Sequence, residues 1–368
     1  MKPVTYHLGA FPPKQLDWQR LVPLIGPANA ALARYDGLLS AIPNPHVLLS
    51  PLVTQEAVLS SKIEGTRVTV GEVLEYEAHI HNLSESQKND AEEVINYRKA
   101  LQACSQALEE RPFSQHILRS AHAILMQGVR GQGKTPGAYR TNQNWIGSSD
   151  STIETASYIP IAPEHLQTGM DLWERYFNEK RELDALVQLA IIHAEFEALH
   201  PFNDGNGRLG RMLIPLFLYQ RKLLHSPDFY MSAYLETNRD EYIDRLRAIS
   251  SHGSWTEWCE FFLKGILSQA QENERKAKNI LSLYNTLRPS VTEITHSQYA
   301  PNAVDFMFRI PIFSTPHFIQ ESNIPKPTAI RIVNLLVQHN IIEPLRSGKG
   351  RSASIYMFTD LLRITEGL

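Results

Sequence analysis

One twelve-residue stretch, His200 to Arg211 (HPFNDGNGRLGR), most constrains how this chain can fold. Apolar residues at helical spacing precede it over 183–199 and follow it over 212–224. Pro201 disfavours helical geometry at His200, so the first helix is expected to end there with the imidazole at its tip. The stretch is therefore predicted to be a sharp connection between two buried helices.

The second half of the stretch has the composition of an anion site. Gly205 and Gly207 let the backbone turn sharply and bring its N–H groups close to a ligand. The following helix is expected to begin at 206–208, where its free N–H groups and positive dipole end favour an anion. Arg208 and Arg211, spaced i and i+3, fall on one face of that helix. These residues predict a phosphate site with a histidine on one side and a carboxylate beside it.

A metal site is the alternative on the preceding helix. His193, Glu197 and His200 are spaced i, i+4 and i+7, and two histidines with a carboxylate can bind zinc. The spacing does not match the H-E-x-x-H pattern of zinc hydrolases. A zinc hydrolase is the weaker hypothesis, because it leaves Asn206 and both arginines without a role.

The stretch resembles the HPFx(D/E)GNGRxxR signature of the Fic (Fic/Doc) family, and every defining position matches. The resemblance implies a protein adenylyltransferase that moves AMP from ATP to a Ser, Thr or Tyr hydroxyl of a protein, with Mg²⁺. It assigns His200 as the catalytic base that takes the hydroxyl proton, which a near-neutral imidazole suits. It assigns Asp204 as the Mg²⁺ ligand. The Gly-Asn-Gly turn favours adenylylation over relatives that transfer phosphate or phosphocholine.

The resemblance also implies which residues hold the nucleotide. Backbone N–H groups of the turn would bind the α- and β-phosphates, and the two arginines would orient the β- and γ-phosphates. An aromatic ring is expected near the adenine, and Tyr242 with Asn238 beside it is the best match, although tyrosines at this spacing also serve as packing residues. Leu209 replaces a frequent threonine, a change that should not affect catalysis. The nucleotide-contacting residues expected on this basis are Glu64, His200, Gly205, Asn206, Gly207, Arg208, Leu209, Gly210, Arg211, Asn238 and Tyr242.

A second short pattern lies upstream, at residues 60–65 (SSKIEG). Ser50 and Pro51 predict the start of a helix, with serine as N-cap and proline at the first position, and the glycine predicts its end. By itself, Glu64 would be a solvated acid near a helix end. The pattern, however, matches the (S/T)xxxE(G/N) inhibitory motif of Fic proteins. By that resemblance Glu64 would pair with Arg211, which then could not hold the γ-phosphate, and the protein would inhibit itself.

A segment rich in Gly, Ser and Thr (131–163) separates the helical regions before the signature. Two short β-like runs within it predict a hairpin, and the alternative is an ordinary surface loop with a buried Trp145. The segment resembles the flap of Fic proteins, in which extended main chain holds the target over the site. We refer to residues 136–161 as the flap segment. Helical spacing elsewhere predicts helices at 28–40, 70–79, 88–108, 114–127, 164–176, 255–267 and 269–288.

The C-terminal part has a different pattern. Helices are expected at 302–313, 317–321 and 327–339, followed by a strand (342–345), a basic turn (346–351) and a second strand (354–358). This order predicts a winged helix-turn-helix domain. Its basic residues gather in the turn, at Lys349 and Arg351, and at Lys326 and Arg331, which makes DNA a candidate partner. Packing against protein is the alternative.

The predicted fold is therefore mainly α, with four parts. Residues 1–110 form a helical region that contains the inhibitory helix (50–65), and 111–268 form a Fic-type helical core with a short β-hairpin flap. A connecting helix (269–288) leads to the winged helix-turn-helix domain (289–368).

Composition limits the remaining classes. A net charge of -3 argues against bulk electrostatic wrapping of nucleic acid. Two cysteines, Cys104 and Cys259, lack CxxC partners, which predicts buried thiols and a cytoplasmic location. The N-terminus has no apolar h-region, and no run approaches 18 apolar residues, so neither a signal peptide nor a membrane span is expected.

Two rival functions stay open on the sequence. The same site could remove AMP or transfer another phosphate-linked group. Alternatively, the chain could be a DNA-binding regulator whose Fic core senses ATP. The partners considered are ATP, a protein substrate (this chain included), DNA and a second copy of the chain.

Overall fold

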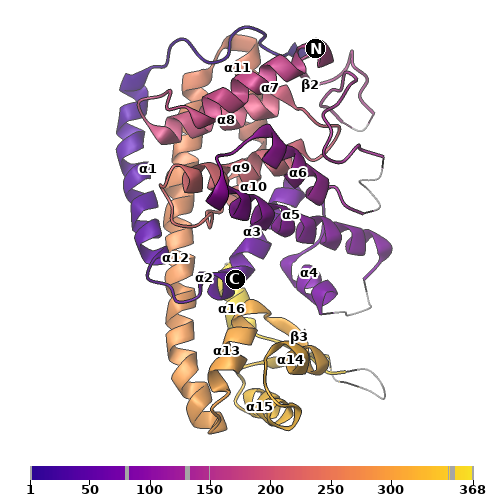
Figure 1. Ribbon diagram of the computed structural model, residues 1–368, viewed down its shortest axis with the longest axis vertical. Coiled ribbons are helices and arrows are strands. Elements are labelled where there is room, and N and C mark those ends of the chain that lie inside the picture. Colours follow the sequence, from indigo (N-terminus) through magenta and orange to yellow (C-terminus); the bar gives the residue numbers. More distant parts are fainter. Residues whose placement is uncertain are drawn as a thin grey trace.

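The computed structural model describes residues 2–78, 83–128, 133–148, 150–346, 348 and 353–366. Within them the chain is mainly helical, as expected, with two small sheets (Figure 1). In chain order the elements are β1 Val4–Thr5, α1 Trp18–Leu39, α2 Pro45–Leu48, α3 Ser50–Ile63, α4 Val70–Glu77, α5 Glu85–Glu110, α6 Gln115–Leu125, β2 Tyr158–Ile159, α7 Pro163–Asn178, α8 Ala185–Leu199, α9 Asn206–Gln220, α10 Ser232–Thr237, α11 Arg239–His252, α12 Trp255–Thr295, α13 Ala300–Arg309, β3 Ile312–Ser314, α14 Thr315–Glu321, α15 Lys326–Gln338, β4 Glu343–Arg346, β5 Ile355–Met357 and α16 Thr359–Glu366.

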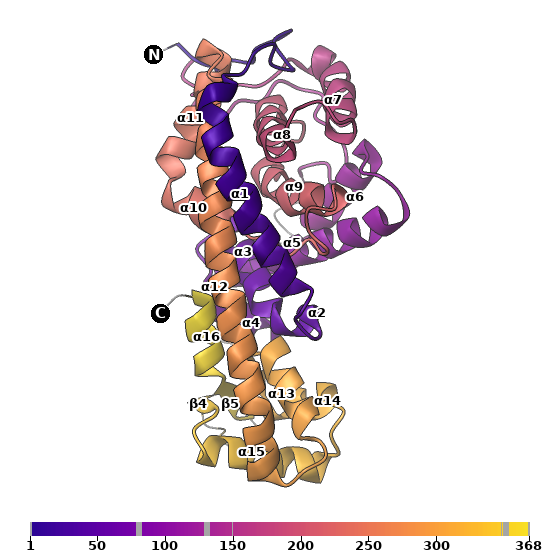
Figure 2. The same ribbon diagram turned by 90° about the vertical axis from the view of Figure 1, so that its left-hand side faces the viewer.

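The longest helix, α12, runs the length of the molecule (Figures 1 and 2). It joins an upper part, which includes α6 to α11, to a lower part, which contains α13 to α16. The prediction of two helices, 255–267 and 269–288, is wrong, because one continuous helix covers both ranges. No glycine or proline interrupts the join at Ser268, and buried residues such as Gln269 and Ala270 continue the packed face across it.

Helix α1 lies along α12 (Figure 2). It begins ten residues earlier than the predicted range of 28–40 and contains Pro23 and Pro27. Asp17 caps it by accepting hydrogen bonds from the N–H groups of Gln19 and Arg20. Packing against α12 outweighs the backbone bonds that the prolines remove, so tertiary contacts override the local signal.

Helix α8 is at the centre of the upper part, surrounded by α7, α9 and α12. It is buried on all sides, which its nearly uninterrupted apolar sequence predicts. It begins after Asp184, whose carboxylate caps the helix, and it ends at His200. The predicted helix end at His200 is confirmed.

Helix α3 carries residues 60–63 of the upstream motif and ends at Glu64. Ser50 is its first residue rather than its N-cap; the cap position is Leu49, which makes no side-chain bond. The Ser50 hydroxyl instead donates to the Arg309 carbonyl at the end of α13. Helix α3 therefore contacts the lower part of the molecule with its first turn and the active-site region with its last.

The flap segment forms the predicted antiparallel pairing at only one point within the described residues. An antiparallel bridge between Ile146 and Tyr158 joins its two runs there. Strand β2 pairs instead with β1 in parallel, with Val4 opposite Tyr158 and Thr5 opposite Ile159. Trp145 is 44% exposed, so the alternative, a surface loop with a buried Trp145, does not fit either. Its indole N–H donates to the Ser151 carbonyl, which holds the ring over the local turn at the surface.

The lower part contains α13 to α16 and an antiparallel sheet in the order β3-β5-β4. The helix predicted over 302–313 ends at Arg309, because Pro311 disfavours helical geometry at Ile310, and the following residues form β3. Ser314 caps α14 by accepting from the His317 N–H. Several residues of the predicted basic turn lie outside the described residues, Lys349 and Arg351 among them, and so does His79 at a predicted helix end.

Two smaller expectations concern cysteines and membranes. Cys104 and Cys259 are both free and buried, as predicted, and burial raises the pKa of the Cys104 thiol to about 12. Among the described residues, the search for a helix that is both long and apolar enough to span a bilayer finds none.

Candidate active site

His200 caps the C-terminus of α8 in a left-handed backbone conformation, with φ 46° and ψ 61°. This conformation is uncommon for a non-glycine residue, and it turns the chain abruptly out of the helix. Burial lowers the pKa of His200 to about 4, against an opposing effect of the nearby Glu64 carboxylate. Nδ1 is buried and makes no hydrogen bond within the described structure. The imidazole is therefore neutral at pH 7 and can accept a proton.

Residues 205–211, which we call the anion cradle, form the turn and the first helical turns of α9. Gly205 is the N-cap with φ 77°, a conformation that favours glycine. Asn206 is 1% exposed, and its side chain bonds both ways with the backbone of Phe202. The Asn206 amide thus fixes the turn itself, and its side chain is occupied within the protein.

Arg211, whose side chain is buried, forms an ion pair with Glu64. Nη2 of Arg211 lies 2.6 Å from Oε1 of Glu64, and the arginine side chain is 2% exposed. Ser60, the first residue of the upstream motif, accepts from Arg211 through its hydroxyl (2.9 Å) and its carbonyl (2.8 Å). Burial tends to raise the pKa of Glu64, but the Arg211 charge and hydrogen bond outweigh it, so the pKa is lowered. The predicted contact between Glu64 and Arg211 is confirmed.

The Glu64 carboxylate also lies directly over the anion cradle. A Cβ placed on Gly207 would come within 2.0 Å of Oε1 of Glu64. The glycine therefore leaves a space in the cradle that an anionic oxygen fills, and here that oxygen belongs to the protein itself. A phosphate oxygen would compete with Glu64 for this position.

Arg208, three residues before Arg211 on α9, binds different acidic side chains. Its guanidinium donates to Glu93 of α5 (Nη1 to Oε2, 3.0 Å) and to Asp204 (Nη2 to Oδ1, 3.3 Å). The Asp204 side chain is 43% exposed and also accepts from the Gly205 N–H. Arg208 and Asp204 line a cavity of about 240 Å³ beside the cradle.

A second cavity, of about 170 Å³, lies between the end of α8, the cradle, the flap segment and α11. Tyr242 lines it and is 3% exposed, whereas Asn238 is not among its lining residues and donates to the Tyr234 carbonyl. The other residues that line it are Ile63, Glu64, Ile146, Ser157, Tyr158, Ala194, Glu197, Ala198, His200, Gly207, Arg211, Arg239, Ile243, Leu246 and Arg247.

The geometry does not favour the zinc hypothesis. Both ring nitrogens of His193 are bonded, Nδ1 to the Gly210 carbonyl (3.0 Å) and Nε2 to the Tyr242 hydroxyl (2.9 Å). Within the ranges that the structure describes, no three His, Cys, Asp or Glu side chains converge as a metal site would need. Glu197 turns toward α9, where the absent side chain of Gly210 leaves room for its carboxyl group.

Two residues absent from the predicted set support the signature. His122 of α6 contacts the Asp204 carbonyl through Nε2 (3.1 Å), accepts from the Gly137 N–H through Nδ1, and stacks on Phe202. Burial lowers its pKa to about 4. Its position on an apolar helix face carried no sequence signal, because a histidine there is usually a packing residue.

Arg140 is the second such residue and is 3% exposed. It donates to the carbonyls of His200 (2.9 Å) and Leu199 (3.3 Å), which satisfies groups left free at the end of α8. It also donates to the Asn142 and Ile161 carbonyls, near the two ends of the flap segment. Burial lowers its pKa to about 10. The Tyr-Arg pair in the flap segment was the signal that could have found it.

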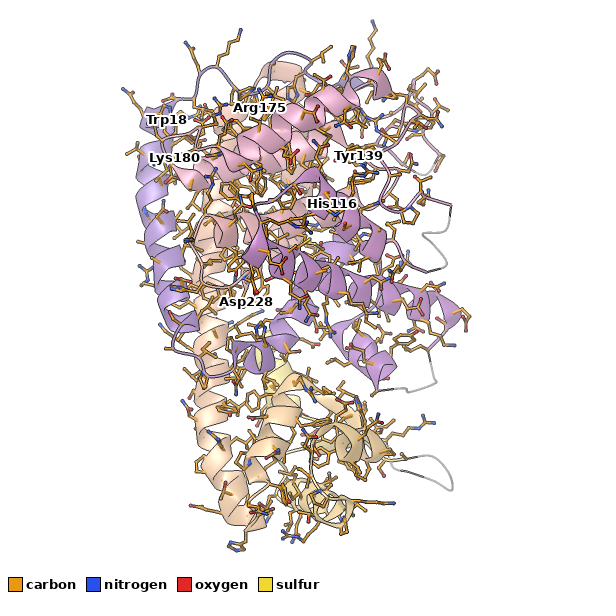
Figure 3. The ribbon with its side chains drawn as sticks, in the orientation of Figure 1. Trp18, His116, Tyr139, Arg175, Lys180 and Asp228 are labelled. Atoms are coloured by element: carbon orange, nitrogen blue, oxygen red, sulfur yellow. The ribbon has the colours of Figure 1, made fainter. Side chains whose placement is uncertain are left out.

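Figure 3 shows Tyr139, which precedes Arg140, beside α6 near His116. Its ring packs on Phe202 with centroids 5.1 Å apart, and its hydroxyl donates to Gln115. The beginning of the flap segment is thereby attached to both α6 and the signature.

Family models match two adjoining segments of this chain. Residues 22–106 match the Fic/DOC family N-terminal model, and residues 112–218, which include the whole signature, match the Fic/DOC family model. Together the two matches cover just over half of the chain. The chain belongs to the Fic/DOC family.

Relatives and solved structures of this family agree with the assignment. A probable protein adenylyltransferase of Aquifex aeolicus is 26% identical over 205 residues, which cover 54% of this chain and 55% of that protein. The protein adenylyltransferase fic-1 of Caenorhabditis elegans is 30% identical over 84 residues, 22% of this chain and 15% of that protein. The chain thus aligns with about half, or much less, of the length of these relatives.

Two solved structures share the fold. A Fic family protein from Desulfovibrio desulfuricans G20 superposes with a TM-score of 0.59 at 19% identity, covering 94% of this chain and 98% of that one. The Fic-1 fragment from C. elegans gives a TM-score of 0.53 at 18% identity, covering 73% and 76%. The first match extends over nearly all of this Fic protein, including its lower part.

Proposed function

We propose that this Fic protein is a protein adenylyltransferase that transfers AMP from ATP to a hydroxyl of a protein and is inhibited by its own Glu64. The observation that carries the proposal is the position of Glu64, on Arg211 and over Gly207. That position is an anion site filled by a carboxylate. Because Glu64 occupies this position, the γ-phosphate of ATP could not bind there, and ATP would bind in a non-productive pose.

The reaction would use groups already in place around the cavity. His200 would take the proton of the acceptor hydroxyl, and the oxygen would attack the α-phosphorus. The bond from the α-phosphorus to its bridging oxygen would break, and pyrophosphate would leave. Backbone N–H groups at the start of α9 would stabilise the charge that develops on the phosphate oxygens. Arg208 and Arg211 would orient the β- and γ-phosphates.

Asp204 fits the role of the Mg²⁺ ligand. Its carboxylate is half exposed beside the cradle, and Mg²⁺ is commonly held by one or two carboxylates together with substrate phosphates. When bound, the ion would neutralise phosphate charge. Arg208 and the Gly205 N–H orient the carboxylate from the protein side.

The test compares the wild type with Glu64→Gly after incubation with ATP and Mg²⁺. Removing the carboxylate frees Arg211 and opens the space over Gly207, so we expect at least tenfold more AMP incorporation in the variant. Intact-mass and peptide mass spectrometry would measure it and would identify the acceptor residue if the chain modifies itself. Equal incorporation by both proteins would contradict the inhibition.

A matched control is Glu236→Gly. Glu236 pairs with Lys62 of α3 (2.8 Å), two residues before Glu64, but not with Arg211. Glu236→Gly should therefore leave AMP incorporation at the wild-type level.

Incubation with a pre-modified target instead of labelled ATP would reveal the rival activity, removal of AMP.

We also infer that the lower part is a winged helix-turn-helix domain. The order α13, β3, α14, α15, β4, β5 and the antiparallel sheet support this. Helix α15 exposes Lys326, Ile330 and Asn334, spaced i, i+4 and i+8 on one face. DNA binding is the second candidate function, and a gel shift that survives His200→Ala but is lost on Lys326→Glu would support it.

A further inference from the structure

Strand β2 of the flap segment has neighbours on both edges. Ile146 exchanges backbone hydrogen bonds with Tyr158 on one side (2.9 and 3.1 Å). On the other side the Tyr6 N–H donates to the Ile159 carbonyl (2.9 Å), within the β1–β2 pairing. Figure 1 shows the N-terminus beside β2, far in sequence from the residues it contacts. Residues 4–7, which we call the N-terminal arm, thus include β1, the outer strand of this small sheet.

The side chains of the arm bind a buried carboxylate on α8, the helix that ends at His200. Glu195 lies in α8, five residues before His200, and is 0% exposed. The Tyr6 hydroxyl donates to its Oε1 at 2.6 Å, and Nε2 of His7 lies 2.9 Å from its Oε2. Both carboxyl oxygens therefore have partners from the arm. Without those partners a buried carboxyl group would lack hydrogen bonds, which is costly.

The same histidine continues the contacts into the flap segment. Nδ1 of His7 lies 2.7 Å from the Ser250 hydroxyl in α11, and that hydroxyl lies 3.2 Å from the Tyr158 hydroxyl. Tyr158 also donates to the Ala198 carbonyl of α8 (3.3 Å) and lines the cavity that contains His200. A connected set of hydrogen bonds therefore links the arm, α8, α11 and the flap segment.

We propose that the N-terminal arm sets the position of the flap segment over His200, with Tyr6 and His7 as positioning residues that act through Glu195 and Tyr158. The inference rests on the proposed function, because the flap segment matters for transfer only if a protein acceptor is held there. The arm contacts neither Gly207 nor Arg211. Loss of its side chains should therefore impair transfer to a protein and leave ATP binding intact.

The experiment uses the full chain carrying Glu64→Gly, with and without Tyr6→Phe or His7→Gln. We expect AMP transfer to fall about tenfold in each double variant, as for a lost hydrogen bond to a buried carboxylate. The dissociation constant for ATP, measured by calorimetry, should change less than twofold. Hydrogen exchange should become faster in peptides covering 143–148 and 157–161.

Tyr76→Phe is the matched control. Its hydroxyl donates to Glu92 at 2.7 Å, a tyrosine–glutamate bond of nearly the same length, between α4 and α5. Transfer and flap-segment exchange should both stay at the level of the parent variant. If Tyr76→Phe reduced AMP transfer and altered flap-segment exchange as much as the arm variants do, losing any tyrosine–glutamate hydrogen bond would have this effect. That result would overturn the positioning role of the arm.

Two further results would overturn the inference: unchanged exchange in the flap-segment peptides, or ATP binding that weakens in step with transfer. Failure of the Glu64→Gly parent to incorporate AMP would instead contradict the proposed function. In that case hydrogen exchange and ATP binding still decide whether the arm holds the flap segment.

Discussion

The anion cradle and the flap segment border the same cavity but are built in different ways. The cradle is the start of a helix, with Asn206 and Arg211 at 1% and 2% exposure and with backbone bonds inside α9. The flap segment has one bridge and a two-residue strand, and its Trp145 is 44% exposed. The cradle, which we propose binds ATP, is therefore held by its own backbone, whereas the flap segment, which we propose holds a target, is held by side-chain bonds to other elements.

The difference has a simple physical origin. A helix satisfies its own backbone groups except at its ends, and the free N–H groups at the start of α9 are the ones that an anion can use. The flap segment has few backbone partners, so side-chain bonds attach it: its own Arg140 and Tyr158 donate to carbonyls at the end of α8, and His122 of α6 accepts from the Gly137 N–H. Such a segment can vary in shape without disturbing the cradle.

The largest effect is expected from His200→Ala in the Glu64→Gly background. Loss of the base should reduce AMP transfer by about 1000-fold or more, since the general base contributes 10² to 10⁴ and nothing nearby replaces it. ATP binding should persist, because the cradle is intact. Transfer would be measured as labelled AMP on protein, and binding by calorimetry. Residual transfer within tenfold of the parent would show that the base is another group.

Arg140→Met should disturb both regions at once. It leaves carbonyls of α8 and of the flap segment without a donor, so we expect a loss of about 3 kcal/mol in unfolding free energy and slower AMP transfer. Urea unfolding and the labelling assay would measure them.

The control for Arg140 is Arg119→Met. Arg119 is exposed and donates to a single flap-segment carbonyl, that of Gly137 (2.8 Å). It should change stability by less than 1 kcal/mol. Equal losses of unfolding free energy in the two variants would mean that Arg140 is no more important than Arg119 for joining the flap segment to α8.

His122→Gln should change how stability depends on pH. The folded protein keeps His122 neutral down to a pKa of about 4, whereas the unfolded chain takes up the proton near 6.5. The unfolded chain therefore binds more protons between these values, so the free energy of unfolding of the wild type is highest above pH 6.5. It falls by on the order of 3 kcal/mol as the pH drops toward 4. Urea unfolding at pH 7 and pH 4.5 should show that the free energy of unfolding decreases less between these two pH values in the variant than in the wild type. If the variant and the wild type lost stability identically with falling pH, the loss would have to come from another buried histidine, His193 or His200.

Trp145→Ala should have the smallest effect and should separate the two regions most clearly. The indole lies outside the anion cradle, so ATP binding and protein stability should be nearly unchanged. Transfer to a protein target should fall a few-fold, as expected for one exposed contact. Leu183→Ala, at a residue 82% exposed before α8, is the control. A loss of ATP affinity in Trp145→Ala would show that the two regions are not independent.

Sequence reasoning located the cradle because its determinants are local. Pro201, Gly205 and the apolar runs on either side lie within about forty residues, and each acts on its own stretch of backbone. The motif at 60–65 and its pairing with Arg211 were both predicted by resemblance, and opposite charge explains why the two side chains bind each other. Capping of α6 by Ser114 and of α14 by Ser314 is local in the same way, since each serine bonds to an N–H only three residues further along the chain.

The rest depended on contacts between distant segments. Pairing of β1 with β2, the reach of Arg140 across the end of α8, and the burial of Glu195 under the arm join residues that the chain places far apart. The unbroken α12 and the early start of α1 result from each helix covering the other's apolar face. The sequence by itself determined the anion cradle, because a turn and a helix start are local. Only the tertiary structure decided what holds the flap segment over it, because those bonds exist only once the helices are packed.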